Sequence, residues 1–267
     1  MTRAAAVSGL SPQTPLEEAA AKLLHARFAD VRRLEIRAVH RLDAHEVHDL
    51  RVACRRLRAA IKVFGGKPLR RLDPLVEHLQ DALGEVRDVQ LQLRWLTRHH
   101  RAAPAREKRL AEKEAALRQA LALWSLRSAP RVLRALPNVR TNGKLSGKPM
   151  RKRLRRRIAD VSHALEEARS LKPAAAHALR IAAKKLRYEA ELLREAFDLD
   201  GLIEELSGLQ DAFGDLHDAD ARVLVTRRDR RLSGLAKRER EKLGKTAASV
   251  LRRWQRARLA FEARKRI

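Results

Sequence analysis

The sequence predicts an all-α protein, and its composition and periodicity support this fold class. Aromatic residues make up only 3% of the 267 positions, whereas Ala, Leu, Arg and Glu dominate. Such a composition favours helices with aliphatic packing over sheets, which need β-branched and aromatic residues. Apolar residues recur at helical spacing along most of the chain, and no convincing strand alternation interrupts them. The apolar content of 45% is enough for one large core or two smaller ones.

The first half of the chain is expected to contain five helices. Gly65 and Gly66 end the second helix, and Pro68 is suited to begin the third. Gly84 is expected to separate the third helix from the fourth, and Pro104 follows the end of the fourth. The expected ranges are 16–39, 44–64, 68–83, 85–101 and 105–126.

A linker is predicted in the middle of the chain. Asn142-Gly143, Gly147 and two prolines fall within residues 137–149, and such residues mark turns and loops. Helical patterns follow at 150–171, 173–197, 201–213, 215–230 and 234–264. The predicted organisation is a flexible N-terminus at 1–15, a first helical bundle at 16–136, the linker at 137–149, and a second helical bundle at 150–267.

Two motifs occur twice, once in each half. The segment Leu79–Asp88 (LQDALGEVRD) recurs as Leu209–Asp218 (LQDAFGDLHD), with six of ten positions identical and an offset of 130 residues. The pattern His-x-x-Arg-x-x-x-basic-basic-x-Arg begins at His48 and again at His177, an offset of 129 residues. Two motifs with nearly the same offset indicate an internal duplication.

Basic residues line one face of the predicted helix at 44–64. At 100° per residue they fall within an arc of roughly 80° and extend along about 21 Å. Leu50, Leu57, Ile61 and Phe64 lie on another side, which can be buried. The planar fork of Arg donates two hydrogen bonds to phosphate oxygens, and Lys supplies a mobile charge, so this face is suited to a phosphate-rich ligand. The stripe consists of His48, Arg51, Arg55, Arg58 and Lys62.

The second half repeats a shorter stripe, which consists of His177, Arg180, Lys184 and Arg187. Glu191 stands where the first stripe has Lys62, so the second stripe carries less positive charge. A solvated helix face is the alternative interpretation, but such faces usually mix charge signs at i,i+4. Arg56 and Lys185 lie off the main arcs and rank second, with Tyr188. Further basic residues that can widen the surface are Lys148, Arg151, Arg155, Arg252, Arg253 and Arg256.

The charge of the chain predicts a polyanionic partner. Lys and Arg total 60 against 33 Asp and Glu, which gives a formal charge of +27. A folded molecule with this charge repels itself unless a polyanion neutralises it. Nucleic acid, an anionic membrane and polyphosphate all favour a basic surface, so net charge does not separate them.

The remaining composition indicates a soluble cytoplasmic protein. Cys54 is the only cysteine, which excludes an intramolecular disulfide and a zinc site built on several thiolates. The N-terminal run lacks the apolar stretch of a signal peptide, and no window of about 18 uncharged apolar residues occurs, so no membrane span is expected.

Repeated carboxylates allow a metal or acid–base interpretation, since carboxylates can hold divalent cations. Gln80-Asp81 and Gln210-Asp211, with Asp88 and Asp218, are the residues concerned. A structural interpretation is preferred, because these positions flank Gly84 and Gly214 at an expected helix-to-helix turn, where Asp can cap a helix and Gln can orient arginines. No metal and no cofactor is therefore expected.

Two other functions remain as alternatives. His48-Asp49 and His217-Asp218 superficially resemble the His-Asp pairs of metal-dependent phosphohydrolases, but a cationic stripe disfavours a divalent cation, and no Walker-type phosphate loop occurs. Nonspecific nucleic-acid binding is the second alternative. Single-strand binders stack bases on aromatic residues, and only Tyr188 is placed among the basic residues for that purpose.

The repeated motifs resemble the paired signatures of the CHAD family. The segments 47–58 and 177–188 and the two LQD-x-x-G segments carry the resemblance, which covers roughly residues 16–261. It implies two helical bundles related by a pseudo-two-fold axis, a basic central channel or groove where the halves meet, and inorganic polyphosphate as a ligand that is bound without catalysis. The implied binders are the residues of both stripes, and Glu191 departs from an ideal basic lining. The sequence does not indicate whether the cellular purpose of such binding is granule targeting, storage or control of chain length.

Overall fold

The computed structural model describes residues 4–256, and every secondary-structure element among them is a helix. The predicted all-α fold class is therefore confirmed. The described residues divide into two compact units, the first formed by 4–10 and 14–143 and the second by 11–13 and 144–256. The change from one unit to the other at Gly143 falls inside the segment predicted as a linker.

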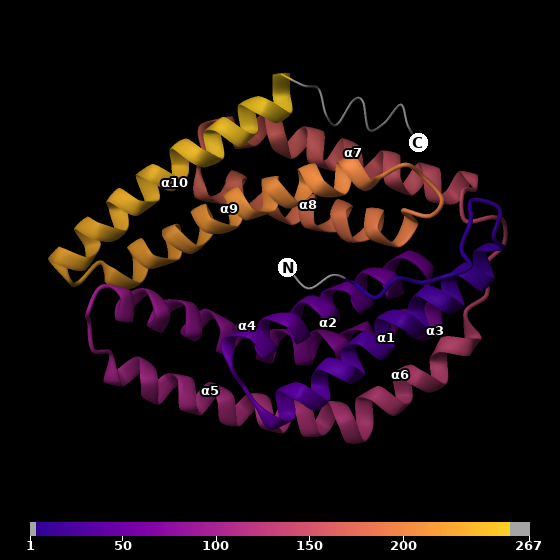
Figure 1. Ribbon diagram of the computed structural model, residues 1–267, viewed down its shortest axis with the longest axis horizontal. Helices are drawn as coiled ribbons and strands as arrows, with labels where there is room; N and C mark the ends of the chain where they lie inside the picture. Colours follow the sequence, from indigo (N-terminus) through magenta and orange to yellow (C-terminus); the bar gives the residue numbers. More distant parts are fainter. Residues whose placement is uncertain (1–3, 257–267) are drawn as a thin grey trace. The chain divides into compact units, whose positions relative to one another are not determined.

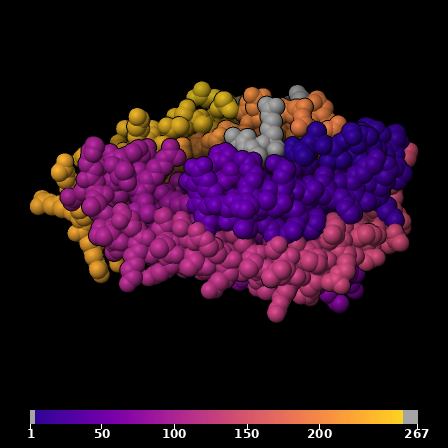
Figure 2. All heavy atoms as spheres, turned by 60° about the horizontal axis from the view of Figure 1, so that its bottom comes forward, coloured from indigo at the N-terminus to yellow at the C-terminus, as the bar shows by residue number. Residues whose placement is uncertain are grey.

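The first unit is a bundle in which successive long helices pack on one another (Figure 1). Helix α1 packs on α2, α2 on α4, and α4 on α5. In Figure 2 the indigo surface of the N-terminal helices adjoins the magenta-to-pink surface of α5 and α6. The elements are α1 (Leu16–His40), α2 (Ala44–Phe64), α3 (Lys67–Arg70), α4 (Asp73–Arg98), α5 (Pro104–Leu123), the π-helical turn η1 (Trp124–Ser128), α6 (Ala129–Ala135) and the 3-10 turn η2 (Leu136–Asn138).

The second unit has the same serial packing, with α7 on α8, α8 on α9 and α9 on α10. Its core includes the fully buried side chains of Phe213 and Trp254. The elements are α7 (Lys148–Glu167), the 3-10 turn η3 (Ala168–Ser170), α8 (Pro173–Leu193), α9 (Asp200–Thr226) and α10 (Arg230–Arg256). Among residues 4–256, no helix is both long enough and apolar enough to cross a membrane.

Local sequence signals define the ends of α2. The Asp43 side chain caps the helix by accepting hydrogen bonds from the backbone N–H groups of His45 and Glu46, each at 2.9 Å. Gly65 ends it by donating its N–H to the Ile61 carbonyl. The side predicted to be apolar is buried, since Ile61 is fully inaccessible to solvent, as are Leu50 and Leu57. The opposite side of the helix therefore remains for the basic residues.

Two expected helix breaks are wrong. Gly84 lies inside α4 and Gly214 inside α9, and both helices continue through the glycine without interruption. A glycine within a helix costs about 1 kcal/mol relative to Ala, so its presence needs a local reason. Since Asp81 and Asp211 lie within continuous helices, the expectation that they cap helices at a turn is also wrong.

The helix expected to end at 126 instead continues to Ala135 through a π-helical turn. Pro130 has no backbone N–H and its ring clashes with the carbonyl four residues earlier in a regular α-helix. The wider turn at Trp124–Ser128 precedes this proline, which then stands in the first turn of α6, where no N–H is needed. Trp124 also joins η1 to α1, because its Nε1 donates to Glu35 Oε2 at 2.9 Å.

Residues of the predicted flexible N-terminus make specific contacts. Arg27 Nη2 donates to the Ala5 carbonyl at 2.6 Å, and Lys22 Nζ donates to the Gly9 carbonyl at 3.2 Å. Further along, the Ser146 hydroxyl donates to the Pro12 carbonyl at 2.8 Å. These contacts hold Ala5, Gly9 and Pro12 in place before α1.

Candidate anion-binding site

The basic stripe of α2 lies along its seam with α4. The Arg51 guanidinium occupies the space beside Gly84, where an added β-carbon would lie only 3.2 Å from Arg51 Nε and Nη2. Arg51 Nε is buried and has no hydrogen-bond partner among residues 4–256. The absence of a side chain at Gly84 therefore lets a guanidinium lie against the α4 backbone, which is the local reason for this helical glycine.

The second unit repeats this arrangement between α8 and α9. There Arg180 lies over Gly214, with an added β-carbon 3.8 Å from Arg180 Nε. Arg51 and Arg180 occupy the same position of the His-x-x-Arg motif, and the two glycines occupy the same position of the LQD-x-x-G motif. In each unit, then, the two repeated motifs meet across one helix pair.

Arg87 joins the stripe of α2 from α4. Burial lowers the pKa of His48, and the positive charges of Arg87 and Arg55 lower it further, while Asp49 opposes the shift. Arg87 also donates to the Ala44 carbonyl at 3.5 Å, which places its side chain at the start of α2. The imidazole of His48 is thus crowded by two guanidinium groups.

His217 takes the corresponding place in the second unit. Its ring centroid lies 4.9 Å from that of His177. Burial lowers the pKa of His217, and Arg180, His177 and Lys184 add to the shift, whereas Asp218 opposes it. The sequence indicates neither Arg87 nor His217 as a phosphate-binding residue, although the ninth position of the ten-residue repeat is Arg in one copy and His in the other.

The C-terminal end of the first stripe is bound to carboxylates. Arg58 Nε and Nη2 lie 2.9 and 3.0 Å from the two oxygens of Asp73, and Nη2 lies 2.6 Å from Glu77 Oε1. Lys62 Nζ lies 3.3 Å from Asp73 Oδ2. Arg58 is 8% exposed, so it is a buried partner of α4 rather than an open cation. The structure therefore separates Arg58 and Lys62 from His48, Arg51 and Arg55.

At the C-terminal end of the second stripe, Arg187 has partners from its own helix and from α9. Arg187 Nη1 lies 2.9 Å from Glu191 Oε1, its Nε donates to Gln210 Oε1 at 3.1 Å, and its guanidinium lies over the Tyr188 ring at 4.9 Å. Gln210 in turn donates to the Ala183 carbonyl at 3.4 Å. Gln210 thus orients an arginine. Glu191 gives Arg187 the counter-charge that the first unit takes from α4.

The basic and aromatic residues that the sequence ranks second as candidate binders lie on several surfaces. Arg56 is 8% exposed and Tyr188 is 7% exposed, whereas Lys185 is open to solvent on α8. Arg253 on α10 pairs with Glu205. The other basic residues named as possible extensions, Lys148, Arg151, Arg155, Arg252 and Arg256, are exposed on α7 and α10.

Two groups of side chains result, one in each unit. The first cation set is His48, Arg51, Arg55 and Arg87, and the second cation set is His177, Arg180, Lys184 and His217. Within the described residues, neither Arg51 nor Arg55 forms an ion pair with a carboxylate, in contrast to Arg58 and Lys62. Each set combines guanidinium or ammonium groups with imidazoles, and all of these groups can donate hydrogen bonds to phosphate oxygens.

A metal site does not form from the repeated carboxylates in the part of the chain that the structure describes, since no group of three or more His, Cys, Asp or Glu side chains there could hold an ion. Asp218 is half-buried, and burial raises its pKa, while Arg180 and His217 oppose this. Its surroundings are therefore cationic, which disfavours a divalent metal ion.

Comparison with solved structures shows that the fold is shared with known proteins. The CHAD domain from the plant Ricinus communis aligns with a TM-score of 0.69 at 20% sequence identity, covering 94% of this chain and 96% of that one. PptA from Streptomyces chartreusis aligns with a TM-score of 0.53 at 19% identity, covering 95% and 100%. Comparison with curated protein sequences gives no match.

The structural alignments show that the fold is shared, and the motifs connect the fold with a family. The sequence profile of the CHAD domain matches residues 22–227, a span that contains both copies of both motifs and both cation sets. The resemblance carried by the repeated motifs is therefore confirmed, and the chain belongs to the CHAD domain family.

Proposed function

We propose that the protein binds inorganic polyphosphate, without catalysis, through the first and second cation sets. The observation that carries this proposal is the recurrence, in both units, of an arginine laid over a helical glycine beside histidine and further basic groups. At Gly84 an added β-carbon would lie 3.2 Å from the Arg51 guanidinium, so this glycine leaves space that Arg51 uses, at a cost to helix stability, which supports a function for Arg51.

The chemistry of the sets favours phosphate groups. Among residues 4–256, Arg51 and Arg55 form no ion pair with a carboxylate, so their guanidinium forks can bind the oxygens of a phosphate, and an anion would relieve the crowding of positive charge around His48. A chain of phosphates supplies one charge after another to the row of cations on each helix. The basic channel shared by the two halves, which the family resemblance implies, remains a prediction.

Nucleic acid fits the sets less well than a chain without bases. The one aromatic residue that the sequence offered for base stacking, Tyr188, is buried under the Arg187 guanidinium. Single-strand binders need exposed aromatic faces. Association with DNA at low salt is still expected from the charge of +27, but it should be weaker than polyphosphate binding at physiological salt.

Charge reversal tests the proposal. The triple variant Arg51→Glu, Arg55→Glu, Arg180→Glu should lose polyphosphate affinity by about a hundredfold or more at physiological salt, since each lost phosphate contact weakens binding. A matched control is Arg227→Glu, Arg228→Glu, Arg231→Glu, which changes the net charge equally at exposed positions of the second unit. The measurement is polyphosphate binding, with circular dichroism to verify helical content. Equal losses in both variants would refute the assignment of the site.

The absence of catalysis has its own test. Polyphosphate incubated with the wild-type protein and Mg²⁺ or Mn²⁺ should keep its chain length on a gel. Shortening that requires the metal ion, and that disappears in a protein-free control, would instead support the phosphohydrolase alternative.

A further inference from the structure

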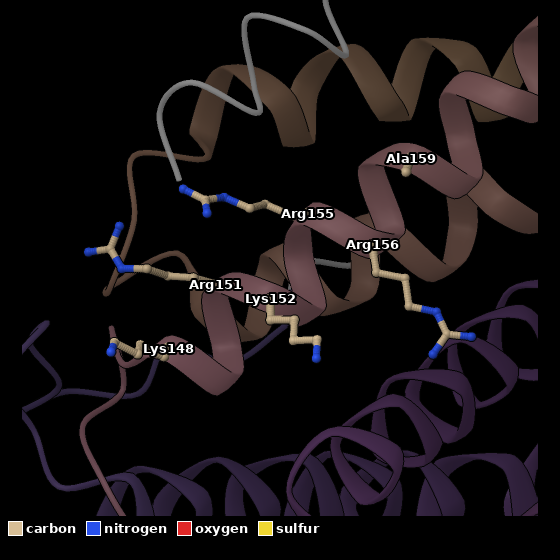
Figure 3. Close-up of a pocket in the computed structure, with 6 residues that line it drawn as sticks. All are labelled: Lys148, Arg151, Lys152, Arg155, Arg156 and Ala159. Atoms are coloured by element: carbon tan, nitrogen blue, oxygen red, sulfur yellow. The ribbon is translucent and has the colours of Figure 1, made fainter.

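Helix α7 carries a basic surface that lies outside both cation sets. Its exposed face forms a hollow of about 620 Å³ that is lined, among the described residues, by side chains of α7 itself. Figure 3 shows Arg151 and Arg155 extending to one side of the helix and Lys152 and Arg156 to the other, with the small side chain of Ala159 on the helix face between them. The lining residues, here called the α7 trough, are Lys148, Arg151, Lys152, Arg155, Arg156 and Ala159.

The cations of the trough differ from the other basic residues of the same helix. Arg153 forms two hydrogen bonds with the buried Glu189 carboxylate, at 2.7 and 2.8 Å, and Arg157 binds both Glu189 and Asp160. In the part of the chain that the structure describes, Lys148, Lys152, Arg155 and Arg156 have no carboxylate partner. The helix therefore separates these two structural cations from Lys148, Lys152, Arg155 and Arg156.

The basic residues that line the trough work against the stability of the helix. Lys148 and Lys152, Arg151 and Arg155, and Lys152 and Arg156 are like charges at i,i+4, which destabilise an isolated helix. The first turn of α7 contains no acidic residue, and its N-cap, Gly147, provides no side-chain cap, so the positive end of the helix dipole adds to the same field. An anion lying in the trough would remove both disadvantages.

Part of the trough is already fixed in place. Arg151 Nε donates to the Ser146 carbonyl at 2.9 Å, and its guanidinium lies over the Phe197 ring at 5.1 Å. These contacts hold one wall of the trough at the N-terminal end of α7. A ligand consequently meets a side chain with reduced freedom, which lowers the entropic cost of binding.

The trough has no counterpart in the first unit. The buried residues Met150, Leu154, Ile158 and Val161 of α7 match the buried Ala20, Leu24, Phe28 and Val31 of α1 at an offset of 130. The positions of α1 that correspond to the five trough cations are Glu18, Ala21, Lys22, His25 and Ala26. Lys22 is paired with Glu18 at 2.7 Å. The basic row is thus a property of the second unit alone and not a consequence of the repeated motifs.

We propose that the α7 trough is a second polyanion-binding surface, which holds a further stretch of a long polyphosphate chain. This inference rests on the proposed function. The trough is about 16 Å long from Lys148 to Ala159, and its two rows of cations flank a line along the helix axis, so it suits an extended chain better than a single phosphate. Because α7 packs on α8, which carries part of the second cation set, one chain bound at both places gains affinity by multivalency.

The test compares a long polyphosphate with tripolyphosphate. The trough variant is Lys152→Glu, Arg155→Glu, Arg156→Glu, and its control is Arg227→Glu, Arg228→Glu, Arg231→Glu. The trough variant is expected to bind the long chain about tenfold more weakly than the control does, because loss of a second contact point removes the multivalent gain. Both variants are expected to bind tripolyphosphate with the same affinity, because this short chain has no multivalent gain to lose. Glutamates near the N-terminus of α7 are compatible with the helix dipole, so folding should be preserved.

Three results would overturn the inference. Equal weakening in the trough variant and the control, or equal weakening for long and short chains, would show that only net charge matters. A trough variant that loses duplex DNA binding while it keeps long-chain polyphosphate affinity would make the trough a nucleic-acid surface. If the wild-type protein binds neither long-chain polyphosphate nor tripolyphosphate, both the proposed function and this inference are wrong. If the wild-type protein binds polyphosphate but the trough variant weakens long and short chains equally, only this inference is wrong.

Discussion

The pair formed by Arg51 and Gly84 shows how single residues define the site. Helical periodicity was sufficient to place Arg51 on a basic face, but the glycine was interpreted as a turn residue, which is its most common role. In the structure it is a helical position where the guanidinium takes the space of a side chain. Sequence patterns within one helix cannot reveal such a contact, because it depends on a residue thirty-three positions away.

A matched pair of glycine substitutions tests this contact. Gly84→Ala should raise the free energy of unfolding by up to about 1 kcal/mol, because Ala has the higher helix propensity. The same substitution should weaken polyphosphate binding several-fold, since the new methyl group displaces Arg51. Gly214→Ala should stabilise to a similar extent with unchanged affinity, because the Arg180 side chain lies 3.8 Å away, at ordinary contact distance. Urea unfolding and a binding titration measure both quantities. Equal affinities for the two variants would show that the Arg51 position is not critical.

The imidazoles of His48 and His217 should make binding depend on pH. Their pKa values lie below the usual 6.5 in the free protein, chiefly because of burial and then because of nearby cations. The folded state therefore takes up fewer protons than the unfolded state as pH falls through about 6.5, so the ligand-free protein should lose stability there. A bound polyanion raises both pKa values, so binding should be accompanied by proton uptake and should tighten as pH falls.

Calorimetry in buffers with different ionisation heats measures that proton uptake directly. The double variant His48→Gln, His217→Gln should take up fewer protons on binding than the control His25→Gln, His163→Gln, which changes two exposed imidazoles. An affinity that stays constant between about pH 8 and 6 in the wild type would contradict a role for the two histidines.

At the scale of elements, the helix pair α2–α4 explains why the predicted stripe divides into two parts. Along α2 itself, acids at i,i+4 are absent from the basic face. The carboxylates that bind Arg58 and Lys62 come from Asp73 and Glu77 at the start of α4. Periodicity predicted the face correctly, as the burial of Leu50 and Leu57 shows, but the partner across the seam depends on the tertiary packing of α4.

Neutralising these carboxylates should change binding and stability in opposite directions. The variant Asp73→Asn, Glu77→Gln leaves the buried Arg58 without a full counter-charge, so the free energy of unfolding should fall by about 1–3 kcal/mol. At the same time Arg58 and Lys62 become available to a phosphate chain. The slope of log affinity against log salt concentration should therefore become steeper, by an amount that corresponds to about one to two additional phosphate contacts.

The control for this prediction removes the same charge elsewhere. Glu17→Gln, Glu18→Gln on α1 releases exposed ion pairs with Arg140 and Lys22, which contribute little to stability. The salt slope of this control should stay close to that of the wild type. A slope for the Asp73 and Glu77 variant that matches the control would show that the end of the stripe lies outside the ligand's path.

Other elements were predicted with different success for identifiable reasons. Helices α1 and α2 begin and end within a residue or so of the expected ranges, because their ends are set locally, as the Asp43 cap at the start of α2 and Gly65 at its end show. The joining of α5, η1 and α6 was missed, because a proline inside a helical pattern normally ends the helix, and a π-helical turn leaves no signature in sequence spacing.

At the scale of the whole molecule, composition correctly predicted an all-helical chain, and the duplicated motifs led to the family. The grouping of each cation set could not be predicted in full, because two helices supply its members and one of them, α4 or α9, had been divided in the prediction. The excess of 60 basic over 33 acidic residues remains the dominant property of the surface and explains why a polyanion is the expected partner.

The most direct test of polyphosphate binding is competition at physiological salt. The protein is first bound to labelled duplex DNA, and then long-chain polyphosphate or unlabelled DNA is added at equal concentrations of phosphate groups. Binding through cation sets that have no exposed base-stacking platform predicts that polyphosphate displaces the label at a much lower concentration than DNA does. Displacement by unlabelled DNA at the same or a lower concentration would contradict it.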